Sequence, residues 1–217
     1  MSDPSAPPKS IVAAFDFDGT LTFRDTLFPF LNFAVGKRRI LFALPKQLPR
    51  FIGFLLGFVS RQKVKEGLLR SAIKGMSILE IRQKGLAFAE GPLQALINPV
   101  GMQRVNLHQS QGHRCILVSA TLNVYLQPWC AKEKFDDLIC SKLEVDENGK
   151  ITGNLDGKNC WGAVKADRLI EILGKDSNFS LYAYGDARGD REMLHLSDHS
   201  FYRTFSSESD DKSFMKA

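Results

Sequence analysis

Short apolar runs, each followed by a polar turn, recur along this chain. The three clearest runs are Ile11–Phe15, Cys115–Val118 and Leu181–Tyr184. Continuous apolar runs of this length indicate strands that are buried on both faces. The other expected elements are two shorter strands, at Leu138–Cys140 and Ser200–Tyr202, and three helices, at Leu122–Lys134, Ala163–Leu173 and Arg191–Ser197. Strands that alternate with helices predict an α/β fold with a doubly wound, mostly parallel sheet.

The pattern changes between residues 24 and 110, where helical spacing replaces the strand-like runs. One set of apolar residues stands at i, i+3, i+4 and i+7, which is one face of a helix: Phe51, Phe54, Leu55 and Phe58. Ser77 and Glu80 have the spacing of a capping box, which opens a helix. We therefore expect four or five helices in this segment and no strand.

These patterns divide the chain into two parts. An α/β core is expected at 11–23 and 111–205, and residues 24–110 form a helical insertion after the first strand, which is called the cap below. Asn148–Gly149 predicts a hairpin within the core, because Asn-Gly favours a tight hairpin turn. The ends, 1–10 and 206–217, are expected to be loose tails.

Charge separates the same two parts. The 217 residues carry a net charge of +5, but residues 24–110 hold 14 Lys and Arg against 4 Asp and Glu, a net of +10. The remainder holds 15 basic and 20 acidic residues, a net of −5. The inserted segment also contains 8 of the 16 phenylalanines. Basic residues interleaved with aromatic ones are typical of a surface that lies on a membrane.

This composition leaves several interpretations open. Residues 40–60 are very apolar, but their longest charge-free run, residues 51–60, is too short for a spanning helix, which needs about 20 residues. Peripheral binding to an anionic membrane is one expectation, with Phe51, Phe54 and Phe58 inserting beside basic residues. The basic candidates are Lys37, Arg38, Arg39, Lys46, Arg50, Arg61, Lys63 and Lys65. The alternative is an ordinary cap with solvated charges, and nucleic-acid binding is not expected because no motif supports it.

Two carboxylates directly follow the first strand. Asp16 and Asp18 stand one residue apart, and Gly19 comes next. Ligands bind at the carboxyl ends of strands in open α/β sheets. Neighbouring carboxylates repel each other unless a cation or proton separates them, and oxygen ligands suit Mg²⁺. Glycine lets backbone N–H groups approach an anion closely. This stretch therefore predicts a Mg²⁺ and anion site.

Three later positions suggest the rest of a phosphate site. Ser119 follows the second strand, where a hydroxyl can donate to a phosphate oxygen. Lys165 stands near the start of a helix, where an ammonium can neutralise phosphate charge. Asp186 and Asp190 follow the strand that ends at Tyr184. Taken singly, Ser119 would more simply be an ordinary serine at a strand end, and Lys165 an ordinary solvated lysine on a helix. The prediction of a phosphate site therefore depends on the four positions together.

In this order, the four positions resemble the motifs of the haloacid dehalogenase (HAD) superfamily. The first is Asp16-Phe17-Asp18-Gly19-Thr20, and the fourth is Gly185-Asp186-Ala187-Arg188-Gly189-Asp190. The likeness covers residues 11–205 and is closest to subfamily IB, which includes phosphoserine phosphatase and phosphatidylglycerophosphatase C. The latter also resembles this chain in its apolar, basic cap. The resemblance implies a Rossmann-like core, an inserted cap and Mg²⁺-dependent hydrolysis of a phosphomonoester.

The resemblance also implies a role for each site residue. Asp16 would attack phosphorus and form an aspartyl-phosphate, and Asp18 would serve as acid and then base. Mg²⁺ would be held by the carboxylates of Asp16 and Asp186 and by the backbone carbonyl of Asp18. Asp190 would position the lysine or water at the metal. The expected phosphate-binding residues are Gly19, Ser119, Ala120 and Lys165.

Departures from the family pattern bear on the substrate. Ala120–Thr121 stands where phosphoserine phosphatases carry Gly-Gly, Arg24–Asp25 stands where they carry Glu at the cap entrance, and Ala187 replaces the usual motif IV Ser. We therefore favour an anionic lipid phosphate, such as phosphatidylglycerophosphate, or a similar amphiphile. A soluble-metabolite phosphatase is the alternative. A further alternative is a membrane-surface or interaction module without catalysis, although the four motifs argue against it.

Cysteine usage and the first residues suggest the compartment. The four cysteines, at 115, 130, 140 and 160, form no C-x-x-C pair and indicate reduced thiols. The first ten residues are polar and rich in proline, without the apolar region of a secretory signal. We expect a cytoplasmic protein, with peripheral attachment to the inner face of the membrane as the further hypothesis. The oligomeric state is left open.

Overall fold

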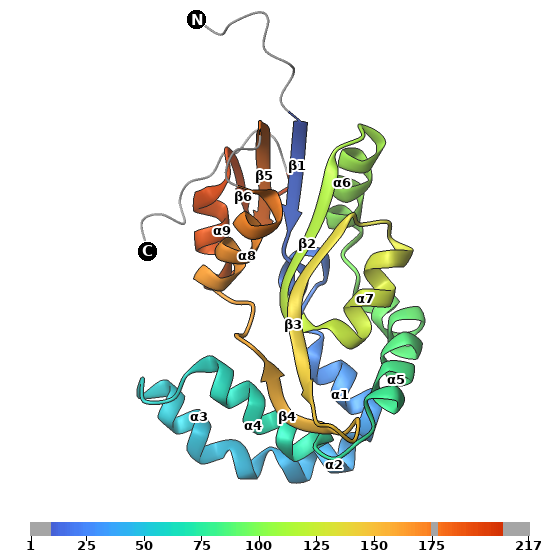
Figure 1. Cartoon of the computed structure of the whole chain (residues 1–217), viewed down its shortest axis with the longest axis vertical. Helices are drawn as coiled ribbons and strands as arrows, with labels where there is room; N and C mark the ends of the chain where they lie inside the picture. The colour runs from blue at the N-terminus through green and yellow to red at the C-terminus, as the bar shows by residue number, and fades with distance from the viewer. Residues whose placement is uncertain (1–9, 175–177, 206–217) are drawn as a thin grey trace, which may run out of the picture.

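A six-stranded sheet forms the centre of the computed structural model, which describes residues 10–174 and 178–205 (Figure 1). Its order is β4-β3-β2-β1-β5-β6, and all neighbours are parallel except the β3–β4 pair. The strands are β1 (Ser10–Phe15), β2 (Arg114–Leu122), β3 (Asp137–Val145), β4 (Ile151–Asp156), β5 (Phe179–Gly185) and β6 (His199–Tyr202). The prediction of a doubly wound, mostly parallel α/β sheet is confirmed.

Alternation along the strands separates two apolar layers. Ala13 and Phe15 of β1 point to one face, where they join buried residues of α6 (Pro99–Ser110) and α7 (Asn123–Lys132). Val12 and Ala14 point to the other face, toward α8 (Ala163–Leu173) and α9 (Arg191–Leu196). Helices therefore cover both faces of the sheet (Figure 1).

The segment between β1 and β2 holds six α-helices in the described chain, rather than four or five. Besides α6, they are α1 (Leu27–Val35), α2 (Lys37–Ala43), α3 (Leu48–Leu55), α4 (Arg61–Ile73) and α5 (Ile78–Glu90). α5 packs against α7, and α6 packs against β2. In Figure 1, α1 to α4 gather beside the far end of the β3–β4 hairpin; these four are the cap helices below. The 24–110 boundary of the cap stays a prediction.

The predicted hairpin is present and supports the cap helices. Gly149 has φ +71° in the turn between β3 and β4, the conformation for which Asn-Gly was expected. β4 packs against α4, and Gly153 permits this contact, because a Cβ there would come 2.6 Å from Cα of Arg70. β3 is one strand of nine residues, longer than the predicted Leu138–Cys140.

Two details of the cap prediction are wrong. α3 ends at Leu55, so Phe58 does not continue its apolar face. Gly57, with φ +79°, ends the helix: its N–H donates to Phe54 O at 3.0 Å, and the N–H of Phe58 donates to Gly53 O at 2.8 Å. A helix does begin after Ser77, as predicted, since α5 starts at Ile78, but within the described chain the side chain of Ser77 makes no capping bond.

Candidate active site

The carboxyl ends of β1, β2 and β5 lie together, because these strands are parallel neighbours. Asp16 follows β1 directly, and Asp186 follows β5. Ser119 lies within β2, which runs on to Leu122 after a register break beyond Val118. The sequence therefore placed the end of this strand too early, but the predicted site residues still converge on one edge of the sheet.

Lys165 joins two of the predicted carboxylates. Its buried Nζ donates to Oδ1 of Asp16 and, at 2.6 Å, to Oδ1 of Asp190. The other oxygen of Asp190 accepts the backbone N–H groups of Asp186 at 3.2 Å and of Ala187 at 3.0 Å. Although burial opposes it, the two carboxylates hold the pKa of Lys165 above its ordinary value. Asp190 therefore orients both the ammonium and the Asp186 loop.

Thr20 and Gly19 bring the two remaining loops together. The hydroxyl of Thr20 lies 3.2 Å from Oδ2 of Asp16 and 3.3 Å from Oδ1 of Asp186. Gly19 has φ +89°, and a Cβ there would come 2.7 Å from Cγ of Asp186. Only glycine fits this conformation and this close approach without displacing the carboxylate.

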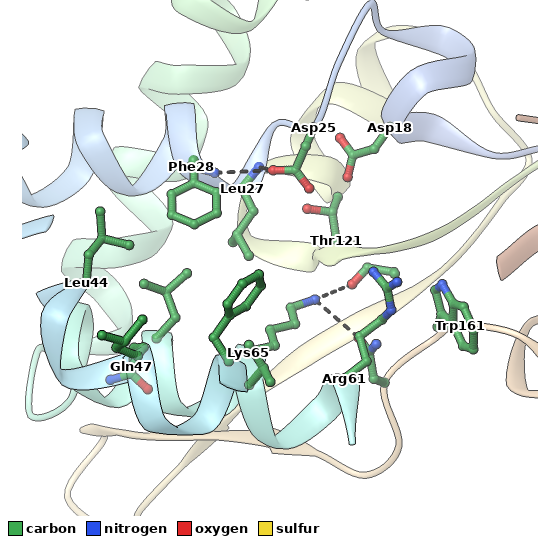
Figure 2. A pocket seen from close by; sticks show the side chains of 16 residues that line it. Asp18, Asp25, Leu27, Phe28, Leu44, Gln47, Arg61, Lys65, Thr121 and Trp161 are labelled. Carbon is green, nitrogen blue, oxygen red and sulfur yellow. Dashed lines mark hydrogen bonds between the residues drawn. The ribbon is translucent and has the colours of Figure 1, made fainter. Parts of the chain in front are cut away.

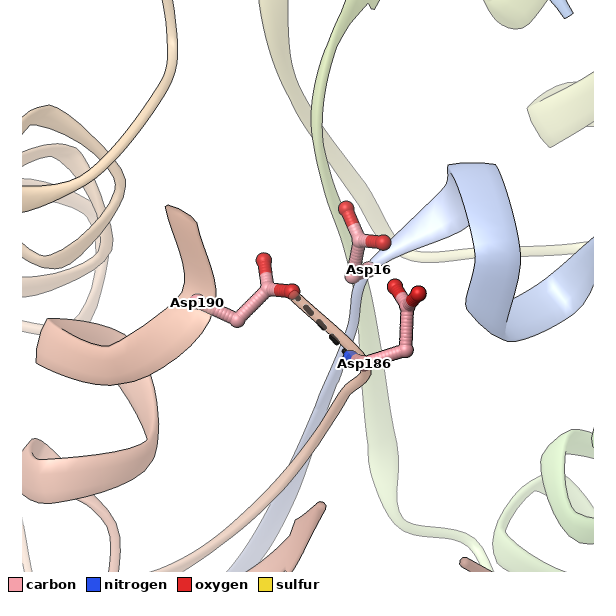
Figure 3. A group of neighbouring side chains, drawn as sticks. All are labelled: Asp16, Asp186 and Asp190. Atoms are coloured by element: carbon pink, nitrogen blue, oxygen red, sulfur yellow. Dashed lines mark hydrogen bonds between the residues drawn. The ribbon is translucent and has the colours of Figure 1, made fainter. Parts of the chain in front are cut away.

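The resulting carboxylate cluster suits a divalent cation. Oxygens of Asp16, Asp186 and Asp190 lie within 4.8 Å of one another, and Figure 3 shows the three side chains facing one space. Together with the ammonium of Lys165, three carboxylates give a net charge of −2. Burial and the carboxylate of Asp190 raise the pKa of both Asp16 and Asp186. The ammonium of Lys165 therefore does not fully compensate the negative charge of the cluster. Oxygen ligands with unmet negative charge fit Mg²⁺.

Only part of this cluster is available to an ion. Both oxygens of Asp190 are engaged by Lys165 and by backbone N–H groups. Asp190 is therefore less available to an ion than Asp186, whose carboxylate accepts from the Thr20 hydroxyl alone within the described residues. The carboxylate of Asp18 is outside the cluster in the described chain, so a contribution from this residue would come from its backbone.

The side chain of Asp18 belongs to a separate hydrogen-bonded chain. Its Oδ1 accepts the backbone N–H of Thr26 at 2.9 Å and the Thr26 hydroxyl at 2.6 Å. That hydroxyl lies 2.9 Å from the hydroxyl of Tyr125, which in turn contacts the hydroxyl of Thr121. Burial, and then the carboxylate of Asp25, raise the pKa of Asp18 to about 7. A carboxyl group with this pKa can both give and take a proton near neutral pH.

The predicted phosphate-binding residues on β2 flank these carboxylates. Ser119 is buried, and its Oγ accepts the N–H of Thr121 at 3.1 Å, a bond that does not use the hydroxyl proton. The carbonyl of Ala120 accepts a hydrogen bond from the Nζ of Lys65. The hydroxyl proton of Ser119 can therefore be donated to a phosphate oxygen.

A cavity of about 470 Å³ opens next to Asp18, between three of the cap helices and the loop before α8 (Figure 2). Its apolar lining consists of Leu27, Phe28, Leu44, Leu48, Phe51, Val64, Leu68 and Trp161. The guanidinium of Arg61 lies 4.9 Å from the ring centroid of Trp161. This cavity offers a mainly apolar surface beside the proposed acid–base residue, and seven of its sixteen lining residues carry polar or charged groups.

Lys65 brings a positive charge into this cavity. Its Nζ donates to the carbonyl of Ala120 and, at 3.3 Å, to Oδ1 of Asn159 (Figure 2). Burial lowers the pKa of Lys65 to about 8, although the carboxylates of Asp18 and Asp25 favour the ammonium form. An ammonium at this place can contact an acceptor on the substrate close to the scissile bond.

Sequence reasoning missed part of this site. Lys65 was grouped with residues that face a membrane, but it points into the cavity. A signal was available, because Lys65 shares one helical face with Leu68 and Ala72, which are buried. Thr20 stands in the first motif but was given no role, and Thr26 had no comparable signal, because its partners Asp18 and Tyr125 lie 8 and 99 positions away.

Comparison with known proteins assigns the family. The model of the haloacid dehalogenase-like hydrolase family matches residues 13–195. The chain belongs to this family. Protein CicA of Caulobacter vibrioides is 33% identical over 195 residues, which cover 90% of this chain and 86% of that protein. A histidinol-phosphatase of Neisseria meningitidis is 28% identical over 105 residues, 46% of this chain and 47% of that protein.

Solved structures agree on the fold. A protein of unknown function from Bordetella pertussis Tohama I has a TM-score of 0.75 at 22% identity, over 90% of both chains. A phosphoserine phosphatase with a phospho-aspartyl intermediate analogue has a TM-score of 0.59 at 17% identity, over 90% of this chain and 87% of that one. The predictions of an HAD-like core and of a hydrolase enzyme are confirmed.

Proposed function

We propose that this protein is a Mg²⁺-dependent phosphomonoesterase whose substrate is an amphiphile, a phosphate ester with an apolar alcohol portion. One observation carries the substrate class: the predominantly apolar cavity that adjoins Asp18. Phosphomonoester hydrolysis itself is supported by membership of the hydrolase family and by the cluster of Asp16, Asp186 and Lys165.

In the first step, an oxygen of Asp16 attacks phosphorus, and the bond from phosphorus to the alcohol oxygen breaks. Asp18 gives its proton to that oxygen, so the alcohol leaves neutral. In the second step, Asp18 takes a proton from water, whose oxygen attacks the phosphoryl group and releases phosphate from Asp16. The raised pKa of Asp18, about 7, suits both proton transfers.

The surrounding residues stabilise phosphate charge. Lys165 places an ammonium against Asp16, where it can also contact a phosphoryl oxygen. The hydroxyl of Ser119 and the N–H of Ala120 would supply further donors, whereas the N–H of Gly19 already donates to the hydroxyl of Thr22 at 3.2 Å. When bound by Asp16 and Asp186, Mg²⁺ would supply positive charge that lets two anions, carboxylate and phosphate, approach each other.

The cavity determines which alcohol fits best. Its lining consists mainly of aliphatic and aromatic side chains, and Lys65 supplies a charged donor near the reacting end. Burying a methylene group is worth about 0.8 kcal/mol, or about fourfold in affinity. An alkyl or acyl chain therefore gains more here than a small polar alcohol. An anionic lipid phosphate presented at a membrane surface is the substrate that meets these demands.

A soluble metabolite remains the second candidate, and one observation favours it. Asp25 also lines the cavity and could pair with a substrate amine. Its Oδ1, however, already accepts the N–H of Leu27 at 3.0 Å and that of Phe28 at 3.4 Å. A non-catalytic interaction module is disfavoured, because the Asp16–Lys165–Asp190 network is intact.

The test is a substrate series with Mg²⁺ in which only the alcohol changes. Glycerol phosphate, short-chain and medium-chain alkyl phosphates and lysophosphatidic acid are compared, with phosphoserine and histidinol phosphate as polar references. We expect kcat/KM to rise about fourfold per methylene group until the cavity is filled. A preference for phosphoserine or histidinol phosphate over every alkyl ester would refute the amphiphile proposal.

A further inference from the structure

Large apolar side chains are exposed along two consecutive cap helices and the turn after them. Those that do not line the cavity are the members of a surface that we call the α2–α3 face: Leu41, Phe42, Ile52, Leu55, Leu56 and Phe58. Phe42 is 73% exposed and Phe58 is 84% exposed. Nine of the twenty large apolar side chains that are exposed in the described chain lie between residues 41 and 58. The clustering sets this region apart from the scattered exposure of ordinary surfaces.

α3 shows the exposure most clearly. Leu48, Phe51, Ile52 and Leu55 stand at i, i+3, i+4 and i+7, the spacing that normally turns an apolar stripe toward a core. None of the eight residues of α3, all of them described, is buried. Part of this stripe lines the cavity, and the rest belongs to the α2–α3 face. The helix therefore leaves apolar area uncovered by the protein itself.

The charges around this face have one sign. Residues 26–65 contain eight Lys and Arg and no Asp or Glu. Lys37, Arg38 and Arg39 are exposed at the start of α2, and Arg50 is exposed on α3. A partner that covers both the apolar side chains and the basic ones must itself combine an apolar interior with a negative surface. An anionic lipid bilayer has this combination.

The same surface continues into the cavity. Leu44, Leu48 and Phe51 line the cavity and are also exposed, with Leu48 57% exposed. The apolar lining of the cavity therefore reaches the outside of the molecule along α3. A molecule lying against the α2–α3 face can pass its apolar portion along these side chains without crossing a polar surface.

We propose that the α2–α3 face docks on the surface of an anionic lipid bilayer, which the cavity then faces directly. This inference rests on the proposed amphiphile specificity and adds the element that contacts the membrane. The two helices lie in the plane of the interface in this proposal, because α2 and α3 have only seven and eight residues. Among the described residues, no helix could span a bilayer.

The test is flotation of the full chain with two kinds of vesicle, phosphatidylcholine alone and phosphatidylcholine mixed with phosphatidylglycerol. We expect flotation with the mixed vesicles, little with the neutral ones, and partial release by added salt. A basic residue near an anionic surface contributes about fivefold in partitioning. Arg38→Glu with Arg39→Glu should therefore reduce binding at least about 25-fold. Arg82→Glu on α5, also an exposed arginine, is the charge control and should bind normally.

Apolar insertion is tested separately. Phe42→Asp with Phe58→Asp should abolish flotation, whereas Leu79→Asp on α5, 66% exposed, should not. None of these residues touches the cavity, so all variants should hydrolyse an aryl phosphate at the normal rate. Normal hydrolysis by a protein that floats with neither vesicle, or equally with both, would overturn the membrane proposal and leave the proposed function standing. Light scattering could instead detect a dimer of the parent protein that is lost in the variant with Phe42→Asp and Phe58→Asp. The α2–α3 face would then be a dimer interface, and this result would also overturn the membrane proposal.

Discussion

Replacing Lys65 by Met separates recognition of the substrate from the chemical step. The ammonium of Lys65 lies in the cavity, bonded to the carbonyl of Ala120 and to Asn159, and it is not part of the carboxylate cluster. Methionine fills a similar volume without charge. Asn159 keeps one partner in the variant, because its Oδ1 also accepts the hydroxyl of Ser141 at 3.0 Å. The fold should therefore tolerate the change.

The expected loss follows from the type of contact. A hydrogen bond from a charged donor is worth about 1.5–3 kcal/mol, which corresponds to about 10- to 150-fold in affinity. We expect Lys65→Met to raise KM by this factor for a lipid phosphate with a second acceptor near the scissile bond. An aryl phosphate lacks that acceptor and should lose much less. Lys63→Met is the matched control, since Lys63 is exposed on the same helix.

The same residue gives a pH dependence. Because burial lowers the pKa of Lys65 to about 8, its charge is present below that pH and is lost as the pH rises through it. KM for the lipid phosphate should therefore increase above pH 8 in the parent protein, and the Lys65→Met profile should be flat in this range. Steady-state kinetics with both substrates measure this. Equal losses for the lipid and aryl phosphates would refute the assignment of Lys65 to substrate recognition.

Three further predictions concern the carboxylate cluster and the core. Gly19→Ala should weaken Mg²⁺ activation at least tenfold, because its Cβ would displace Asp186, and a Mg²⁺ titration of hydrolysis checks this. Asp190→Asn should lower kcat more than it raises KM, since Lys165 loses a partner; unchanged kcat would contradict the positioning role. Burial lowers the pKa of His108 to about 4 from 6.5, so stability should fall as the pH drops from about 6.5 toward 4. Urea unfolding should show a smaller fall in His108→Gln.

Much of the fold was predictable because the signals are local. β1 and β5 were readable as apolar runs, and α8 has the bounds that its periodicity predicted, Ala163–Leu173. The parallel sheet then brings Asp16 and Asp186 together without any further information, since ligand-bearing loops meet at the carboxyl ends of neighbouring strands.

The rest depended on contacts between distant parts of the chain. Thr26 reaches Asp18 only because the loop after η1 (Phe17–Leu21) folds back, and Lys65 reaches Ala120 from a helix 55 positions earlier in the sequence. The periodicity of Phe51 and Leu55 predicted a helix, but periodicity does not say whether the apolar stripe faces a core or the outside. Packing of α3 on its neighbours decides that.

Asp16 is the proposed nucleophile, and the phosphoenzyme tests this assignment directly. Asp18→Asn removes the group that activates water, so an aspartyl-phosphate formed from a good leaving group should accumulate. The variant is mixed with Mg²⁺ and an aryl phosphate, quenched in acid within its first turnover and digested for mass spectrometry. We predict one added phosphoryl group on the peptide that contains Asp16, and none in Asp16→Asn. A phosphoryl group on another residue, or phosphate release by Asp16→Asn at the parent rate, would contradict the account.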